Sequence, residues 1–206
     1  MSNPSDTIVF RPMVAADIGR VPIGHQGEPQ EVRQRIADIG SSAILAFDGS
    51  QHVGQLQFRR YVPGTRSPQG LWHPLYWADF GERAVDLPAQ TLAVFCYHVG
   101  QLDDTDDRDP RYQGRGIGLR LLDGLLDWAT RAGFAALVAK AVPAPRPIMA
   151  FMGGQAAKAY QERGFQQADS WVDAELKTLV VDKRLVPSDI SPDEAARVSC
   201  MVRRLS

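Results

Sequence analysis

The chain of 206 residues has little cysteine, no excess of charge of either sign and no long apolar run. Its two cysteines, Cys96 and Cys200, are too few for a disulfide framework and leave no cysteine-based zinc site. A formal net charge of −1 gives no basic surface for a nucleic-acid backbone. No stretch approaches the roughly 20 apolar residues that a membrane-spanning helix needs. We therefore expect a globular protein with neither a nucleic-acid nor a membrane partner.

The N-terminal residues contain no basic segment followed by an apolar one, so nothing in them indicates secretion, and we expect a cytoplasmic location. A chain of 206 residues supports one substantial core and is short for two ordinary domains. We expect a single domain over residues 1–185, with a loop inserted at residues 63–90, and a C-terminal helical extension over residues 186–206.

Hydrophobic spacing, together with glycine at the helix ends, predicts the helices. Helices are expected over residues 28–39, 119–131 and 155–163. The C-terminal helix should begin at Ser191, which precedes a proline and stands three residues before Glu194, and should extend to about residue 202. Its apolar side chains would cover a second copy of the chain or the chain's own sheet.

Alternating or continuous apolar runs predict the strands. Strands are expected over residues 7–11, 42–47, 53–59, 92–99 and 135–142, with a closing hairpin of residues 171–172 and 177–183. The turn at residues 48–51 contains glycine and joins two alternating runs, so these runs should form an antiparallel hairpin. The order of the elements predicts an α/β fold in which helices cover a mixed sheet.

The segment of residues 63–90 is rich in proline, glycine and aromatic residues and shows no clear periodicity. Segments of this length are often lids or binding loops in compact domains, and this one is a candidate to line a substrate pocket. The alternative is an irregular excursion whose aromatic side chains pack on the core. Both interpretations stay open for Trp72, His73, Tyr76, Trp77 and Phe80.

Residues 111–118 read Arg-Tyr-Gln-Gly-Arg-Gly-Ile-Gly and lead into the leucine-rich helix. Glycines at positions 114, 116 and 118 let the backbone turn tightly and approach a ligand closely. The helix that follows offers unpaired N–H groups and the positive end of its dipole, which suit a pyrophosphate. The segment is a candidate anion site, although the glycines could instead serve only a tight strand-to-helix connection.

Two common phosphate loops do not fit this segment. A Rossmann loop would need glycine at position 119, where this chain has leucine, and a Walker A loop would need a Gly-Lys-Ser/Thr tripeptide that the sequence lacks. Residues 113–118 instead resemble the Gln/Arg-x-x-Gly-x-Gly/Ala motif of the GNAT-type N-acetyltransferase superfamily. Residues 156–165, an alanine-rich helix with a tyrosine that ends in Gly-Phe, are similar to that family's second signature. The resemblance covers roughly residues 92–165.

The resemblance implies a GNAT-like fold, with a mixed, mostly antiparallel central sheet and helices on both faces. It also implies acetyl-CoA as co-substrate and no bound metal. The backbone N–H groups of the loop would bind the pyrophosphate, nearby arginines could reach the 3′-phosphate, and the end of the preceding strand would lie beside the pantetheine arm. The cofactor-binding residues that it implies are Val99, Gln113, Gly114, Arg115, Gly116, Ile117 and Gly118.

Two residues are candidates for proton transfer. Tyr160 matches the tyrosine that in many family members protonates the departing thiolate, and a phenol with its ordinary pKa near 10 is protonated at neutral pH. It could alternatively be a core tyrosine. His98 stands at the strand end beside the expected thioester and could accept the proton of the amine, although a lone histidine there is more often structural.

Cys96 precedes His98 by two residues and so shares its face of the strand. A cysteine beside a histidine could indicate a covalent thiol enzyme. Burial as a small apolar side chain is the commoner fate of a free cysteine, and family members generally transfer the acetyl group directly.

The implied activity is transfer of the acetyl group of acetyl-CoA to a primary amine of a small molecule or peptide by direct transfer. A non-catalytic acyl-CoA-binding module is the alternative, and a protein that binds ATP in the same loop is a third hypothesis. The implied partners are acetyl-CoA and an amine acceptor, with a homodimer as a further option.

Two features depart from the family pattern. Gly153 stands seven residues before the tyrosine, where family members commonly have asparagine, so a contact to coenzyme A is missing or is made by another residue. Residues 102–110 contain five aspartates and look like an insertion. They could form a solvated loop or attract a cationic amine, whereas an EF-hand is a poor fit because position 109 lacks glycine and position 115 lacks glutamate.

Overall fold

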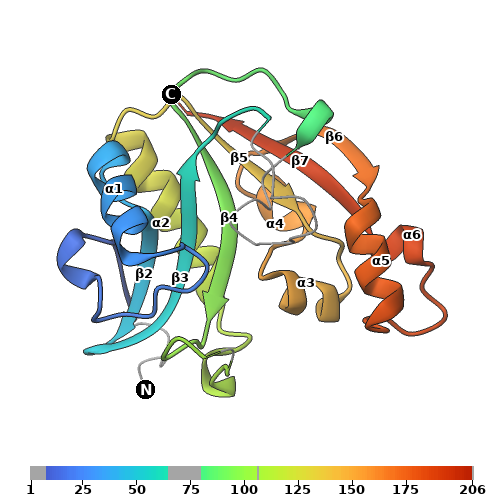
Figure 1. Cartoon of the computed structure of the whole chain (residues 1–206), viewed down its shortest axis with the longest axis horizontal. Helices are drawn as coiled ribbons and strands as arrows, with labels where there is room; N and C mark the ends of the chain where they lie inside the picture. Colours follow the sequence, from blue (N-terminus) through green and yellow to red (C-terminus); the bar gives the residue numbers. More distant parts are fainter. Residues whose placement is uncertain (1–7, 65–79, 106, 206) are drawn as a thin grey trace. The chain divides into compact units, whose positions relative to one another are not determined.

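The computed structural model describes residues 8–64, 80–105 and 107–205, and Figure 1 shows their helices and strands. The strands form a seven-stranded sheet in the order β1-β2-β3-β4-β5-β7-β6. The chain divides into two compact units. The first unit comprises residues 1–60 and 96–134, the second unit comprises residues 61–95 and 135–206, and β4 (Thr91–Val99) contributes residues to both.

The first unit combines antiparallel strands with two α-helices. Its elements are β1 (Ile8–Pro12), the 3₁₀ turn η2 (Ala15–Asp17), α1 (Pro29–Ile39), β2 (Ala43–Asp48), β3 (Gln51–Arg60), the end of β4, the 3₁₀ turn η5 (Pro110–Tyr112) and α2 (Ile117–Arg131). β2 pairs in antiparallel register with both β1 and β3. α2 packs against these strands and buries Leu121, Leu122 and Leu125, because its apolar side chains recur on one helical face.

The second unit holds the remaining strands and four short helices. Its elements are the 3₁₀ turn η4 (Gly81–Arg83), the start of β4, β5 (Ala136–Ala141), α3 (Arg146–Met152), α4 (Ala157–Gln161), β6 (Gln166–Val172), α5 (Ala174–Asp182), α6 (Pro192–Ala195) and β7 (Arg197–Arg204). β5 runs parallel to β4, whereas β7 is antiparallel to both β5 and β6. A buried cluster includes Tyr61, Phe80, Val138 and Cys200.

The predicted fold class is confirmed, since helices accompany a mixed sheet with both parallel and antiparallel pairs. The expected hairpin consists of β2 and β3, and the helix expected over residues 28–39 is α1, which ends at Gly40 with a left-handed φ of 88°. The leucine-rich helix is α2, and the strands expected over residues 92–99 and 135–142 are β4 and β5. The helix expected over residues 155–163 is shorter and corresponds to α4.

The expected C-terminal helix is wrong beyond its first turn. Ser191 accepts a hydrogen bond from the N–H of Glu194 at 3.1 Å, as an N-cap should, but α6 ends at Ala195. From Arg197 the chain forms β7, which pairs with β5 on one side and β6 on the other. Pairing with two strands outweighs the local helix signal. The C-terminal residues therefore belong to the sheet and do not cover a second copy as a helix, while the predicted domain of residues 1–185 stays a prediction.

The closing hairpin expected from residues 171–172 and 177–183 is also wrong. Residues 171–172 end β6, whereas residues 174–182 form α5. The carboxylate of Asp173 accepts a hydrogen bond from the N–H of Leu176 at 3.0 Å and so caps this helix. Leu176 and Val180 are both buried, and their spacing of four residues is helical.

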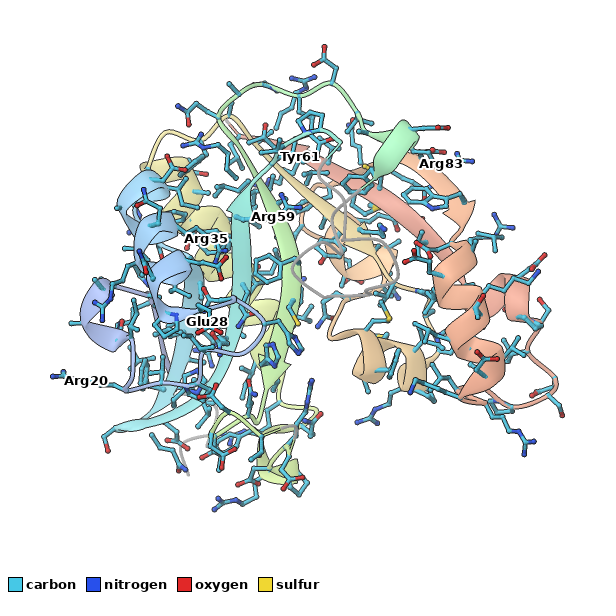
Figure 2. All side chains as sticks on the ribbon, in the orientation of Figure 1. Arg20, Glu28, Arg35, Arg59, Tyr61 and Arg83 are labelled. Atoms are coloured by element: carbon cyan, nitrogen blue, oxygen red, sulfur yellow. The ribbon has the colours of Figure 1, made fainter. Side chains whose placement is uncertain are left out.

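The aromatic side chains of the long loop are only partly described. Trp72, His73, Tyr76 and Trp77 lie outside the described residues, so their role in a lid or pocket stays a prediction. The buried ring of Phe80 lies 6.2 Å from that of Tyr61, labelled in Figure 2, and 6.0 Å from that of Trp171. For Phe80, the packing supports the alternative of an aromatic side chain in the core.

Gly54 of β3 lies so close to β4 that a side chain would not fit. A Cβ at this position would stand 2.8 Å from the carbonyl oxygen of His98 and 3.4 Å from the Cα of Val99. We expect Gly54→Ala to lower the free energy of unfolding by about 1–3 kcal/mol, because the adjoining backbone must shift. Urea unfolding measures this change. Gln51→Ala, on the exposed end of the same strand, serves as control and should stay within about 0.5 kcal/mol of wild type; equal stability of the two variants would contradict the close approach.

Candidate active site

The candidate donor loop connects β4 with α2 in the first unit. After β4 the chain turns at Gly100, which has a φ of 82° and donates its N–H to the carbonyl oxygen of Val53 at 2.8 Å. Gly114 and Gly116 have φ values of 70° and 72°, and α2 begins directly afterwards at Ile117. Side chains with a Cβ rarely adopt this left-handed conformation. The loop therefore depends on glycine at both positions for its conformation.

The backbone of this loop has free space beside it. A Cβ built at Gly114 or Gly116 would have no atom within 4 Å among the described residues, so the glycines serve conformation rather than close packing. The first N–H groups of α2, from Ile117 and Gly118, have no partner within the helix, and the positive end of the helix dipole lies there. This geometry suits an anion and supports the interpretation of the loop as a phosphate site.

Gln113 anchors the loop at both its backbone and its side chain. Its N–H donates to the carbonyl oxygen of Pro110 at 3.1 Å, and its side-chain Nε2 donates to the carbonyl oxygen of Val99 at 3.1 Å. The N–H of Gln113, expected to bind a phosphate oxygen, is thus already engaged. The structure thus joins Gln113 and Val99 by a hydrogen bond, while their part in cofactor binding stays a prediction.

The three arginines near the loop differ in what they contact. The Arg111 guanidinium donates to both carboxylate oxygens of Asp109, which raises the pKa of Arg111. Arg120 lies over the ring of Phe10, with 4.5 Å between its Cζ and the ring centroid. Arg115 lies over the ring of Tyr112 at 5.5 Å, at the edge of the loop itself. Of the three, Arg115 is placed best to meet a phosphate at the loop.

His98 and Cys96 are both buried, with 2% and 1% of their surfaces exposed. Burial, together with the nearby charge of His25, lowers the pKa of His98 to about 3. Burial likewise raises the pKa of the Cys96 thiol to about 12. Near neutral pH the imidazole is therefore neutral and a weak base, and the thiol keeps its proton, which disfavours a covalent thiol route.

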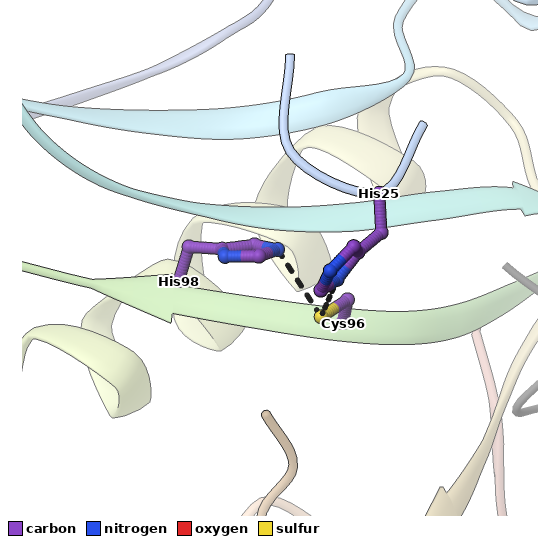
Figure 3. Close-up of side chains that lie close together, drawn as sticks. All are labelled: His25, Cys96 and His98. Atoms are coloured by element: carbon purple, nitrogen blue, oxygen red, sulfur yellow. Dashed lines mark hydrogen bonds between the residues drawn. The ribbon is translucent and has the colours of Figure 1, made fainter. Parts of the chain in front are cut away.

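His25 is a site residue that the sequence analysis missed. Its Nδ1 lies 3.3 Å from the Sγ of Cys96, and the Nε2 of His98 lies 3.2 Å from the same sulfur, as Figure 3 shows. The imidazole rings of His25 and His98 have centroids 4.7 Å apart. His25 lies in a loop and precedes Cys96 by 71 residues, so the sequence gives no direct sign of the contact. The only nearby signal is a pair of glycines, Gly24 and Gly27, which indicate a turn at this place.

The described aspartates of the insertion are mostly exposed, as in a solvated loop, and several of them also accept hydrogen bonds. Asp104 accepts hydrogen bonds from the N–H groups of Ile23 and Gly24 at 2.7 and 3.3 Å. Asp103 accepts one from the N–H of Thr105 at 2.9 Å, and Asp109 binds Arg111. Several of these carboxylates thus hold backbone of their own or a neighbouring loop.

Tyr160 belongs to the second unit, whereas the donor loop belongs to the first. It sits on α4 with 1% of its surface exposed, and its ring packs edge-to-face on Phe165 at 5.2 Å between centroids. Gly153, at the position where asparagine is common, caps α3 with a left-handed φ of 56°. The burial of Tyr160 fits a core tyrosine and equally a phenol shielded from water, so its catalytic role stays a prediction.

The family model described as Acetyltransferase (GNAT) family matches residues 22–152. The match spans more than half of the chain, and the chain belongs to the GNAT family of acetyltransferases, which are acyl-CoA N-acyltransferases. No curated protein matches the sequence. No helix in the described part of the chain is long and apolar enough to cross a membrane.

Solved structures share the fold at low sequence identity. An N-acetyltransferase from Staphylococcus aureus Mu50 is 14% identical with a TM-score of 0.53, and the match covers 100% of both chains. A GNAT-family acetyltransferase from Streptococcus pneumoniae is 13% identical with a TM-score of 0.52, covering 97% of this chain and 99% of that one. A GNAT phosphinothricin acetyltransferase from Sinorhizobium meliloti, in complex with acetyl-CoA, is 16% identical with a TM-score of 0.51, covering 97% and 89%. These likenesses confirm the GNAT fold.

His52, beside the insertion, should make stability depend on pH. Its Nδ1 lies 3.1 Å from the carbonyl oxygen of Gln101, and burial lowers its pKa from 6.5 to about 4. Because the unfolded chain then binds the proton more readily, the free energy of unfolding should fall as the pH drops from about 6.5 to about 4, by up to about 1.4 kcal/mol per pH unit from this group. Urea unfolding at several pH values tests this. In His52→Gln, the free energy of unfolding should depend less steeply on pH between about 6.5 and 4, because one proton fewer is taken up on unfolding. If the free energies of variant and wild type fell in parallel with pH, the assignment to His52 would be wrong.

Proposed function

We propose that the protein transfers the acetyl group of acetyl-CoA to a primary amine of a small molecule or peptide, by direct transfer, in the cytoplasm. The observation that carries the proposal is the donor loop, in which two left-handed glycines lead directly into the first turn of α2 in a chain of the GNAT family. The acetyl-CoA complex of the Sinorhizobium meliloti enzyme, which shares the fold, supports the choice of donor.

The donor would bind through the backbone of residues 114–118. The N–H groups at the start of α2 would donate to the pyrophosphate, with Gln113 holding the loop against Val99. Arg115, which stacks on Tyr112 at the loop edge, is our candidate for contact with the 3′-phosphate. The pantetheine arm would then follow the end of β4 beside Val99.

The transfer itself needs a neutral amine, a polarised thioester and a proton for the thiolate. The amine nitrogen attacks the thioester carbonyl, the new C–N bond forms, and the C–S bond breaks with its electron pair on sulfur. We propose that the phenol of Tyr160 gives its proton to this thiolate and that the amine's proton passes to His98, directly or through water. The neutral state of the buried His98 leaves a lone pair for that proton, while its low pKa makes it a weak base.

Donor binding is tested by replacing Gly116, with a control at the other end of α2. Gly116→Ala and Gly133→Ala each place a Cβ on a left-handed residue, at φ values of 72° and 78°, with no atom of the described structure within 4 Å. Both should lose about 1–2 kcal/mol of stability. Gly116→Ala alone should also weaken acetyl-CoA binding about tenfold, because it disturbs the loop backbone, and isothermal titration measures this.

Equal acetyl-CoA affinities of the Gly116→Ala and Gly133→Ala variants would contradict donor binding at this loop. Thermal shifts with ATP and with acetyl-CoA separate a nucleotide-binding protein from an acyl-CoA enzyme. Stabilisation by ATP alone would overturn the proposal.

The catalytic role of Tyr160 is tested by a CoA-release screen over amine, aminoglycoside, polyamine, amino-acid and peptide acceptors. With an accepted amine, we expect Tyr160→Phe to lower kcat about 100-fold or more, because the thiolate loses its proton donor. Tyr61→Phe is the matched control: it removes the hydrogen bond from another buried tyrosine to the carbonyl oxygen of Val85, 3.0 Å long, and should keep its rate. An unchanged rate in Tyr160→Phe means that the acid role is wrong, and binding without CoA release favours a non-catalytic module.

A further inference from the structure

Three side chains of the first unit, of types that can bind a metal ion, point at one another in Figure 3. The Sγ of Cys96 lies 3.3 Å from the Nδ1 of His25 and 3.2 Å from the Nε2 of His98. One ligand atom from each residue lies within 4.8 Å of the other two. Soft sulfur and imidazole nitrogen are the donors that zinc-type ions prefer.

The spacing of these atoms suits a tetrahedral ion. With Zn–S near 2.3 Å and Zn–N near 2.0–2.1 Å, ligand atoms of a tetrahedral site are about 3.3–3.6 Å apart. The sulfur–nitrogen distance to His25, 3.3 Å, lies at the lower end of that range, and the distance to His98, 3.2 Å, falls just short of it. A thiol has one proton and can donate to only one of the two imidazoles, whereas a metal ion would use a lone pair of all three groups.

The fold positions the three ligands from two directions. Cys96 and His98 are alternate residues of β4, so they share one face of the strand. His25 comes from the segment of residues 22–27, where Gly24 and Gly27 have left-handed φ values of 59° and 87°. His25 is only partly buried, whereas Cys96 and His98 are buried.

Buried amides of β3 hold the segment of residues 22–27 in place. Gln55 donates to the carbonyl oxygen of Pro22 at 2.8 Å. Gln57 donates to the carbonyl oxygen of Ile23 at 3.1 Å and accepts a hydrogen bond from the N–H of His25 at 3.3 Å. Both glutamines are fully buried, which makes their geometry specific.

Asp104 of the insertion holds the same segment from the other side. Its carboxylate accepts hydrogen bonds from the N–H groups of Ile23 and Gly24, next to His25. A histidine held by buried amides and by a carboxylate is pre-organised to meet the two ligands of β4. Metal ligands in proteins are commonly oriented by such surrounding hydrogen bonds.

We propose that His25, Cys96 and His98 form a binding site for Zn²⁺. The ion binds the Sγ of Cys96 as a thiolate, with release of the thiol proton to solvent, and one nitrogen of each imidazole. Three protein ligands leave a fourth position for water or another exchangeable ligand. The site was not expected, because the count of two cysteines in the sequence took no account of histidine partners.

The metal and a proton cannot both occupy the Nε2 lone pair of His98. In the metal-bound protein the proton of the acceptor amine therefore passes to water rather than to His98. The site does not rest on the proposed acetyl transfer, since its ligands and their supports all lie in the first unit and are described without acetyl-CoA.

The test is a Co²⁺ titration of the full-length chain after treatment with a chelator. We expect one Co²⁺ per chain, a thiolate-to-cobalt absorption band in the near ultraviolet, and displacement of the band by Zn²⁺. Cys96→Ser should abolish the band, and His25→Ala should weaken Co²⁺ binding at least about tenfold. Circular dichroism checks that each variant is folded.

Cys200→Ala is the matched control, because Cys200 is the other buried cysteine and lies in β7 of the second unit. It should keep the band and the affinity. Absence of a one-to-one band in wild type, a band that survives Cys96→Ser, or loss of the band in Cys200→Ala would each overturn the site and leave a hydrogen-bonded cluster. The assay uses neither acetyl-CoA nor an amine, so failure of acetyl transfer does not affect it.

A fourth variant separates positioning from ligation. Asp104→Ala removes the acceptor for the N–H groups of Ile23 and Gly24 but none of the three ligands. It should weaken Co²⁺ binding severalfold while the band keeps its wavelength, because the ligand set is unchanged. An unchanged affinity would show that the insertion does not position His25.

Discussion

The alternation of side chains along β4 is the constraint on which the candidate site depends. Cys96 and His98 share a face because they are two residues apart, and the strand end then presents the carbonyl oxygen of Val99 to Gln113. Gly54 fixes the neighbouring strand close beside these residues. A one-residue slip of β4 would turn both side chains to the opposite face. One strand register thus sets the side-chain cluster and the start of the donor loop together.

The proposed anion site of the donor loop relies on backbone geometry rather than on side-chain charge. Gly114 and Gly116 supply two left-handed residues, and the helix that follows supplies its N–H groups and dipole. The residues between the glycines are therefore available for other contacts. Arg115 stacks on Tyr112, and Ile117 is buried in the core. The same short segment thus starts the helix with a buried side chain and, in the proposed site, offers its first N–H groups to the pyrophosphate.

The sequence predicts those features of the structure that are determined by residues close together in the chain. The donor loop and α2 were predictable because glycine positions and leucine spacing lie within a single segment. The cluster of His25, Cys96 and His98 was not predictable, because His25 and Cys96 are 71 residues apart in the sequence. Hydrogen bonds from Gln55 and Gln57 hold the segment of His25 in place, and no sequence pattern indicates them. For β7 the local signal was present but misleading. Ser191 does cap a helix, yet the residues from Arg197 on form a strand, because they pair with two neighbouring strands.

The insertion of residues 102–110 is closed near its ends, where the N–H of Asp109 donates to the carbonyl oxygen of Gly100 at 2.8 Å. Asp104 reaches the segment of residues 22–27, and Asp109 accepts the N–H of Arg111 at the entrance to the donor loop. The insertion is therefore a brace between two loops that are far apart in the sequence. A deletion or lengthening within it would alter the support of both loops in one step, because one short segment carries the hydrogen bonds to both.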